Sequence, residues 1–277
     1  MVRLIGFLVG IGFVVVLGYS LIVGAIAYVG NPPEETVEHE FHREAEAVSF
    51  ASDGPLGRFD RQQLQRGFQV YKEVCAACHS LGYVAFRDLH DLGFTEPEVD
   101  AIAQQWQIEV PSVDPDTGEA ATRPATAADS FPHVYPNEIA ARAANNNALP
   151  PDLSLITKAR EGGADYIHAL LTGYRNPPAE LPEANQPGTG LYYNPYFANL
   201  NLAMPPPLTA DGQVTYADGT EATVDQMARD VSAFLIWTAE PKMEARKSTG
   251  WAVLIFLIFA TSLAWLAYQN VWRDIKH

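Results

Sequence analysis

The chain has 277 residues, of which 48% are hydrophobic, and its formal net charge is −15. This length allows one large domain or two small ones. The acidic excess argues against nucleic-acid binding, because phosphates would be repelled, and it favours a basic protein partner.

The N-terminus begins with an uncharged apolar run over residues 4–30, long enough to cross a membrane as a helix. Arg3 precedes this run, and Ala25-Ile26-Ala27 has the small-residue pattern of a signal-peptidase site. However, the run is longer than the roughly 7–15 apolar residues of an ordinary signal peptide. We therefore favour a retained N-terminal transmembrane helix, with a cleaved signal peptide as the alternative.

Both interpretations carry the middle of the chain across the membrane, with Arg3 left on the cytoplasmic side. Residues 31–58 read as an acidic linker that contains "EETVEHEFHREAE". In a bacterium the far side is the periplasm, where disulfides are possible. We expect the domain at 59–245 to fold there.

The stretch "RGFQVYKEVCAACHSL" contains both cysteines of the chain. Apolar residues at 64, 68, 71 and 74 predict a helix near 60–74 that leads into them. A redox dithiol lacks its βαβ context here, and a zinc site lacks its second pair of ligands. Cys75-Ala-Ala-Cys78-His79 matches the attachment pattern of a c-type haem in every fixed position. We predict thioether bonds from Cys75 and Cys78, and iron ligation by His79.

The rest of the domain is predicted to be mainly α, with long irregular loops and little sheet. Residues 97–132 read as a partly helical segment followed by an irregular excursion rich in proline and aspartate. Further helices are expected near 96–106, 136–145, 164–172 and 224–238.

A sixth ligand for the iron can be sought among the methionines and histidines. Met227 falls on the apolar face of the helix at 224–238, and Met243 lies just before the C-terminal apolar run. Met204 lies in the loop "NLNLAMPPPL", where three prolines remove backbone donors and stiffen the chain. We predict Met204 as the distal ligand, with His133 and His168 as weaker candidates.

A second uncharged run covers residues 248–272, between "EARK" and "RDIKH". Four aromatic residues within it suit the membrane–water interfaces: Trp251, Trp265, Tyr268 and Trp272. Residues 246–277 are therefore predicted to be a transmembrane anchor with a short cytoplasmic tail.

Five blocks, in consistent order over residues 59–273, resemble the cytochrome c1 family, the membrane-anchored haem subunits of the cytochrome bc1 complex. They are "RGFQVYKEVCAACHSL", "YPNEIAARAANNNALPPDLSLI", "EGGADYIHALLTGY", "GLYYNPYFANLNLAMPPPL" and "YADGTEATVDQMARDVSAFLIWTAEP".

The resemblance implies a class I cytochrome c-like domain with one covalent haem c, bound by Cys75 and Cys78. It implies His79 and Met204 as axial ligands and Arg142 as the partner of a haem propionate. The segment "LPPDLS" resembles the proline-rich wall of the haem pocket. Two positions depart from the family pattern, since Asn147 replaces a usual glycine and Leu155 a usual aromatic residue.

The function that the resemblance implies is one-electron transfer from the Rieske iron–sulfur protein to a mobile cytochrome c, soluble or membrane-tethered. The chain would act with cytochrome b in a quinol–cytochrome c reductase of respiratory or photosynthetic electron transport. That complex would be dimeric and lie in the bacterial inner membrane, with the haem domain in the periplasm, and no turnover is expected of this chain alone.

Two other functions compete with this one. A membrane-tethered electron shuttle outside any quinol-oxidising complex would carry the same haem, but it needs only a much shorter domain. A gas sensor would need an open or labile sixth position at the iron, which a bound Met204 would fill.

Overall fold

The computed structural model describes residues 2–32 and 36–274. These residues divide into two units, one before His42 and one from His42 onward. Glu34 and Glu35 of the predicted acidic linker, and residues 275–277 of the predicted tail, lie outside the described residues.

The first unit contains two helices. α1 (Val2–Gly30) has no buried residue, and its only charged side chain is Arg3. At 1.5 Å per residue it is about 44 Å long, which exceeds a hydrocarbon core of about 30 Å. α2 (Val37–Phe41) is a short acidic helix that the sequence did not predict. By length and composition α1 is a candidate membrane span.

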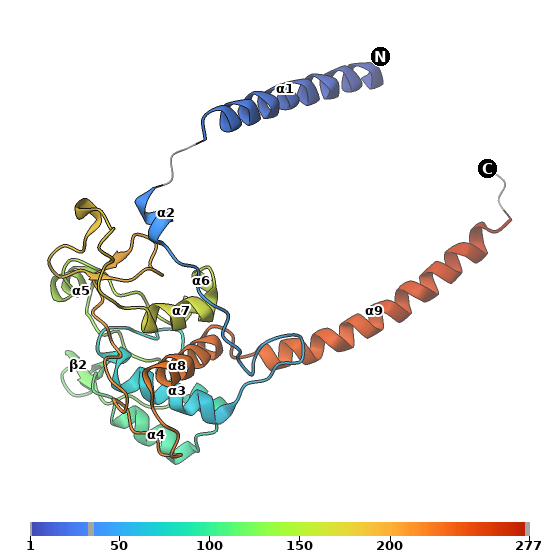
Figure 1. Ribbon diagram of the computed structural model, residues 1–277. Coiled ribbons are helices and arrows are strands. Elements are labelled where there is room, and N and C mark those ends of the chain that lie inside the picture. The colour runs from blue at the N-terminus through green and yellow to red at the C-terminus, as the bar shows by residue number, and fades with distance from the viewer. Residues whose placement is uncertain (1, 33–35, 275–277) are drawn as a thin grey trace. The chain divides into compact units, whose positions relative to one another are not determined.

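The second unit is mainly helical (Figure 1), which confirms the predicted fold class. All five helices predicted between the apolar runs are present, with ends close to the expected ones: α3 (Arg61–Glu73), α4 (Glu96–Gln104), α5 (Glu138–Ala144), α7 (Gly163–Thr172) and α8 (Val224–Ala239). Shorter helices were not predicted: α6 (Ile156–Ala159) and the 3-10 helices Cys75–Ala77, Phe86–Leu92 and Glu183–Asn185.

The last helix, α9 (Met243–Trp272), contains the second apolar run. Met243 is its only buried residue, and the helix is long and apolar enough to cross a membrane. This agrees with the predicted C-terminal anchor.

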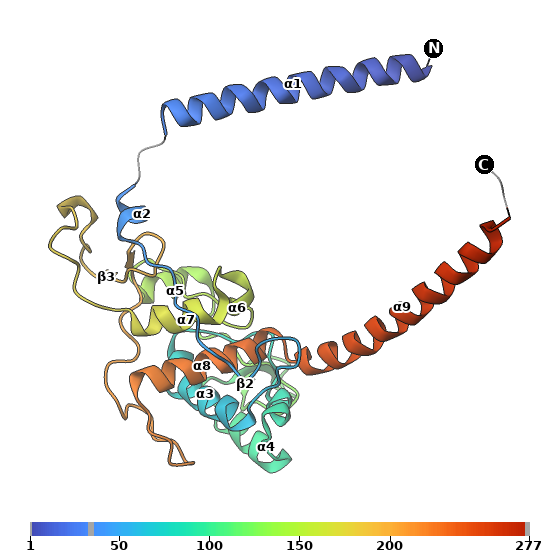
Figure 2. The ribbon, with the colours of Figure 1, turned by 45° about the vertical axis from the view of Figure 1, so that its right-hand side comes forward.

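α3 and α8 lie side by side at the centre of the core (Figures 1 and 2). Gly67 allows this close approach, because a Cβ atom there would lie 2.1 Å from the carbonyl oxygen of Asp230 and 2.7 Å from Cβ of Phe234. Aromatic rings fill the rest of the contact, with the Phe234 ring centroid 5.7 Å from that of Phe68 and 5.8 Å from that of Tyr71. The crossing fixes α3, which leads directly into the cysteine pair.

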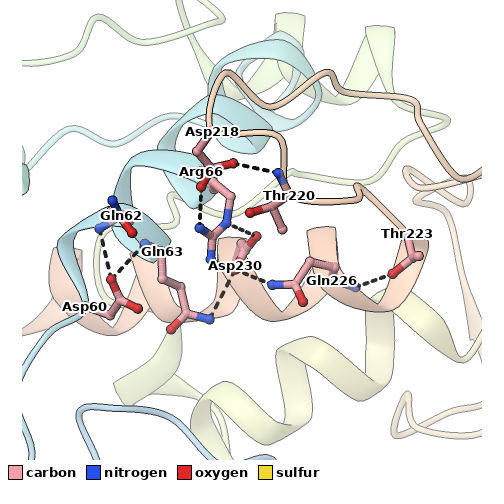
Figure 3. A network of polar contacts seen from close by, with 9 residues as sticks. All are labelled: Asp60, Gln62, Gln63, Arg66, Asp218, Thr220, Thr223, Gln226 and Asp230. Atoms are coloured by element: carbon pink, nitrogen blue, oxygen red, sulfur yellow. Dashed lines mark hydrogen bonds and ion pairs between the residues drawn. The ribbon is translucent and has the colours of Figure 1, made fainter.

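A buried polar network ties α3 to α8 (Figure 3). Asp230 is fully buried and accepts hydrogen bonds from Arg66 Nε at 2.9 Å and from the side chains of Gln63 and Gln226. Arg66 also pairs with Asp218 at 2.7 Å. Burial alone would lower the pKa of Arg66, but its hydrogen bonds to Asp230 and Asp218 outweigh this and leave the pKa raised. The network holds a permanent cation between two carboxylates.

Asp230→Asn is expected to lower the free energy of unfolding by about 2 kcal/mol, because a charged hydrogen-bond acceptor is lost while Arg66 stays half-buried. Urea unfolding of the detergent-solubilised protein measures the change. Asp218→Asn is the matched control and should cost less, because this side chain is 31% exposed. Equal effects of the two substitutions would contradict the assigned role of Asp230.

A small hairpin corrects the prediction of an irregular segment at 97–132. β1 (Val110–Val113) pairs antiparallel with β2 (Ala120–Arg123). Asp114 starts the turn by accepting the backbone N–H groups of Asp116 at 2.8 Å and Thr117 at 3.0 Å. Gly118 supplies the positive φ of 72° that the turn needs. Proline and aspartate therefore marked a turn between two strands rather than an irregular excursion.

A second two-stranded pairing lies near the predicted distal ligand. β3 (Tyr192–Tyr193) pairs antiparallel with β4 (Asn201–Leu202). Leu200, just before β4, is buried and has a φ of 65°, which is strained for a branched side chain. The surrounding loop holds it there, since its carbonyl oxygen accepts the N–H of Asn194 at 2.7 Å.

Candidate functional site

The cysteine pair lies in one tight turn at the end of α3. The backbone N–H groups of Cys78 and His79 both donate to the carbonyl oxygen of Cys75, at 3.0 and 2.9 Å. Cys75 is half-buried, Cys78 is exposed, and neither takes part in a disulfide in the described structure. The turn therefore presents two thiols and an imidazole from a single short segment.

The two cysteines do not have the properties of a redox pair. Burial, with a smaller contribution from Cys78, raises the pKa of the Cys75 thiol to about 12. Reactive dithiols instead need a lowered pKa, because the thiolate is the nucleophile. The raised pKa of Cys75 therefore argues against thiol–disulfide exchange at this residue.

His79 is held as a neutral imidazole. Its Nδ1 lies 2.8 Å from the carbonyl oxygen of Pro151, so this nitrogen carries the proton and donates it. Its Nε2 makes no hydrogen bond within the described residues and is left with a free lone pair. Burial lowers the pKa of His79, although the Pro151 hydrogen bond and the charge of Asp152 act in the opposite direction. An oriented neutral imidazole of this kind is a metal ligand.

A second contact fixes the backbone of the same residue. The buried Tyr71, one turn before Cys75, donates from its hydroxyl to the carbonyl oxygen of His79 at 2.9 Å. His79 is thus held through its ring by Pro151 and through its backbone by Tyr71.

The proline-rich segment at 149–154 lies against the histidine, as its predicted place in the pocket wall requires. Leu153 donates its N–H to the carbonyl oxygen of Ser80 at 2.9 Å. Asp152 accepts the N–H of Gly82 at 2.7 Å, and Ser154 Oγ accepts the N–H of Tyr83 at 3.2 Å. These bonds to a segment about 70 residues earlier position the Pro151 carbonyl.

Met204 follows β4 and precedes three prolines. The residue is half-buried, and its carbonyl oxygen accepts the hydroxyl of Tyr174 at 3.0 Å. Burial raises the pKa of Tyr174, so the hydroxyl keeps its proton and can donate. Tyr174 follows Gly173, the C-cap residue of α7, where the missing Cβ leaves space for the ring of Tyr196. A folded element thereby supports the loop around Met204.

Tyr174→Phe is expected to loosen this loop and weaken a Met204–iron bond, because the only change is the lost hydroxyl donor. The reduced variant should bind carbon monoxide partially, where the parent excludes it. Tyr192→Phe is the matched control, since Tyr192 is more exposed and lies on the neighbouring β3. Exclusion of the gas by both variants would show that Tyr174 does not hold the ligand loop.

Arg142 lies on α5 and is exposed. Its guanidinium donates to the carbonyl oxygen of Asn147 at 3.0 Å and forms no ion pair with a carboxylate of the described chain. Asn147 has a φ of 63°, in the left-handed region that glycine favours and asparagine tolerates. This conformation explains why asparagine can replace glycine here. The other departure, Leu155, is 45% exposed and lies at the N-cap position of α6, where its side chain makes no capping hydrogen bond.

The structure brings Cys75, Cys78 and His79 together, and it adds Pro151 to them. Met204 and Arg142 are held by other partners, so their contacts with a haem stay predictions. The donor set fits a c-type haem. It consists of two thiols at the required spacing, a neutral imidazole, and a thioether on a loop that a hydrogen bond from Tyr174 holds.

The sequence did not predict the hydrogen bonds of three supporting residues: Tyr71, Pro151 and Tyr174. Pro151 acts through its backbone carbonyl, which no side-chain pattern reveals. Tyr71 lies on α3 and meets the backbone of His79, eight residues later and beyond the end of the helix, so helical spacing gave no signal for this contact. The hydroxyl of Tyr174 meets a residue 30 positions away, for which the sequence offers no spacing rule.

Comparison with known proteins agrees with this site. The model of the Cytochrome C1 family matches residues 50–275. Cytochrome c1 of Rhodospirillum rubrum is 47% identical over 236 residues, which cover 81% of this chain and 86% of that protein. A cytochrome c1 heme protein of Solanum tuberosum mitochondria is 46% identical over 239 residues, which cover 86% of this chain and 89% of that protein.

A further relative has both cytochromes in its name. Cytochrome b/c1 of Bradyrhizobium diazoefficiens is 47% identical over 248 residues, which cover 82% of this chain but 35% of that longer protein. Its name couples a cytochrome c1 to a cytochrome b. With the family match over most of the chain, these findings show that the protein belongs to the cytochrome c1 family, carries one covalently attached haem c and is an electron-transfer subunit of the cytochrome bc1 complex.

Proposed function

We propose that this chain takes single electrons from the Rieske iron–sulfur protein and passes them to a mobile cytochrome c within a quinol–cytochrome c reductase. The observation that carries the proposal is the turn of Cys75, Cys78 and His79, in which the Pro151 carbonyl holds Nδ1 and leaves Nε2 free. Family membership supports the haem and the complex. The donor, the acceptor and the direction of transfer are inferred.

Each residue of the site would have a separate role in holding the haem. Cys75 and Cys78 would form the thioether bonds, and His79 and Met204 would be the protein ligands of the iron. Arg142 would pair with a propionate, because a desolvated carboxylate needs a cationic partner. When bound, the haem supplies the one-electron chemistry.

The protein's own contribution is rigidity. Tyr71 and Pro151 fix His79, while Tyr174 and the prolines after Met204 fix the loop that carries Met204. A pair of fixed ligands limits reorganisation when the charge on the iron changes, and a thioether ligand raises the reduction potential relative to a second histidine. The chain needs no general acid, base or nucleophile for this role.

We place the domain at 59–245 in the periplasm of a bacterium, held by α9 in the inner membrane. We also propose that α1 is retained as a second anchor and that residues 31–58 link it to the haem domain. The mass of the mature chain in purified membranes tests this proposal. Loss of residues 1–27 would make α1 a cleaved signal peptide.

The acidic character of the chain supports a basic acceptor. The whole chain has a net charge of −15, and this acidic excess would attract a cationic cytochrome c and increase the rate of encounter. Salt screens such attraction, since the Debye length falls from about 10 Å at 0.1 M to about 3 Å at 1 M. Turnover with a basic acceptor is therefore expected to slow as salt is added.

The proposal is tested on the native complex, purified through an affinity tag on this chain. Cytochrome b and the Rieske protein should co-purify with it, as a dimeric complex. Quinol should then reduce its haem, and an added basic cytochrome c should reoxidise it. A haem that quinol reduces without the Rieske protein, or that the acceptor cannot oxidise, would contradict the assigned direction of transfer.

A further inference from the structure

The loop from Phe50 to Phe59 is clamped onto the first turns of α9. Lys247 donates from Nζ to the carbonyl oxygens of Ser52 at 2.7 Å and Gly57 at 3.3 Å. Glu244 accepts the N–H of Phe59 at 2.7 Å. Both views show this loop beside the start of the helix (Figures 1 and 2). These contacts join positions nearly 200 residues apart, so the loop belongs to the base of the anchor.

The loop is also rigid in itself. The carboxylate of Asp53 accepts the N–H of Phe50 at 2.7 Å, and Arg58 donates its N–H to the carbonyl oxygen of Ala51 at 2.9 Å. A Cβ atom at Gly57 would lie 2.0 Å from the carbonyl oxygen of Asp53, so only glycine lets the two arms meet. Several backbone groups on either side of the tip are thus already paired within the protein.

The depth of the tip follows from its contact with Trp251. Lys247 is the last charged residue before the uncharged run at 248–272, and Trp251 lies one turn further on. Tryptophan near the end of a membrane helix lies at the membrane–water interface. The indole Nε1 of Trp251 donates to the carbonyl oxygen of Pro55 at 3.3 Å. Pro55 and its neighbour Leu56 are therefore level with that interface.

The tip of the loop is apolar and open. Leu56 is 77% exposed, next to the 44% exposed Trp251. A single exposed leucine is common on protein surfaces and needs no explanation. Leu56 differs because a rigid loop holds it beside an interfacial tryptophan.

We propose that the loop at 50–59 rests on the membrane surface, with Leu56 inserted at the boundary between lipid headgroups and acyl chains. Its partner is lipid, because the exposed Leu56 and Trp251 continue the apolar surface of α9, which the bilayer already covers. The loop and α9 would then give the haem domain two points of support on the membrane and restrict its tilt. This inference depends on α9 as the anchor and is independent of the axial ligands.

The test uses the native complex in lipid nanodiscs. Leu56→Cys is labelled with an environment-sensitive fluorophore, and unmodified complex provides the background from other thiols. Quenching is measured with nitroxide-labelled lipids and with aqueous iodide. Ile139→Cys on α5, at a residue that is 82% exposed, is the matched control.

The label at 56 should be quenched by the lipid nitroxide and shielded several-fold from iodide, with the opposite result at 139. Equal iodide quenching at both sites would overturn the proposal, and so would a label at 56 that neither quencher reaches, since a protein would then cover the tip. Trp251→Phe, which removes the indole donor, should reduce lipid quenching at 56. Unchanged quenching in that variant would overturn the assigned role of Trp251.

Discussion

Replacing Met204 by leucine lowers the midpoint potential of the haem and opens its iron to carbon monoxide. Leucine fills a similar volume but has no sulfur to donate, so the sixth position loses its ligand while the stiff loop stays in place. Axial ligands set haem potentials over a range of about 0.8 V, and the fall should be a substantial part of this range. A redox titration of the purified complex, with the reduced spectrum under carbon monoxide, measures both effects.

Two controls make this result specific. Met227→Leu alters a fully buried methionine on α8 and should leave the potential and gas binding unchanged. His133→Gln and His168→Gln examine the weaker candidates for the sixth ligand. If one of these histidine variants, and not Met204→Leu, binds the gas, the distal ligand is misassigned.

Gly67→Ala breaks the crossing of α3 and α8. The added Cβ would lie 2.1 Å from a backbone oxygen of Asp230, and backbone cannot move aside as a flexible side chain can. Overpacking of this kind costs roughly 3 kcal/mol, a large share of the 5–15 kcal/mol that stabilises a typical domain. The yield of haem-loaded protein should fall, and its urea midpoint, followed by haem absorption, should shift to lower urea.

The matched control is Gly188→Ala. At this position the nearest atom to a Cβ is Leu191 Cδ1 at 4.0 Å, which is ordinary van der Waals contact. Its unfolding midpoint should equal that of the parent. A Gly67→Ala protein as stable as this control would mean that the two helices are further apart than described.

The sequence predicted those features that depend on residues close together in the chain. The amphipathic spacing of α3 and α8 is a repeating pattern, and the helices were found where that pattern placed them. The haem motif is likewise contained in five consecutive residues, because both thioether bonds and the proximal ligand come from one turn. Met204 required context from most of the chain, since elimination of the other methionines, the three prolines after it and the family resemblance together pointed to it.

The features that the sequence did not predict depend on contacts between distant segments. The Pro151 carbonyl meets His79 across 72 positions, and Lys247 meets Ser52 across 195. Such contacts exist only after the chain has folded, and backbone groups leave no residue-type signal. The sequence did not predict the hairpin of β1 and β2 for a different reason. Each strand has only four residues and lacks a sustained alternation of polar and apolar side chains.

The central claim is that His79 and Met204 hold the iron of a single covalent haem. The most direct measurement is the near-infrared spectrum of the oxidised native complex, where a methionine sulfur bound to ferric iron gives a charge-transfer band. The account predicts this band in the parent, together with exclusion of carbon monoxide after reduction. A parent complex that lacks the band and binds the gas would contradict it.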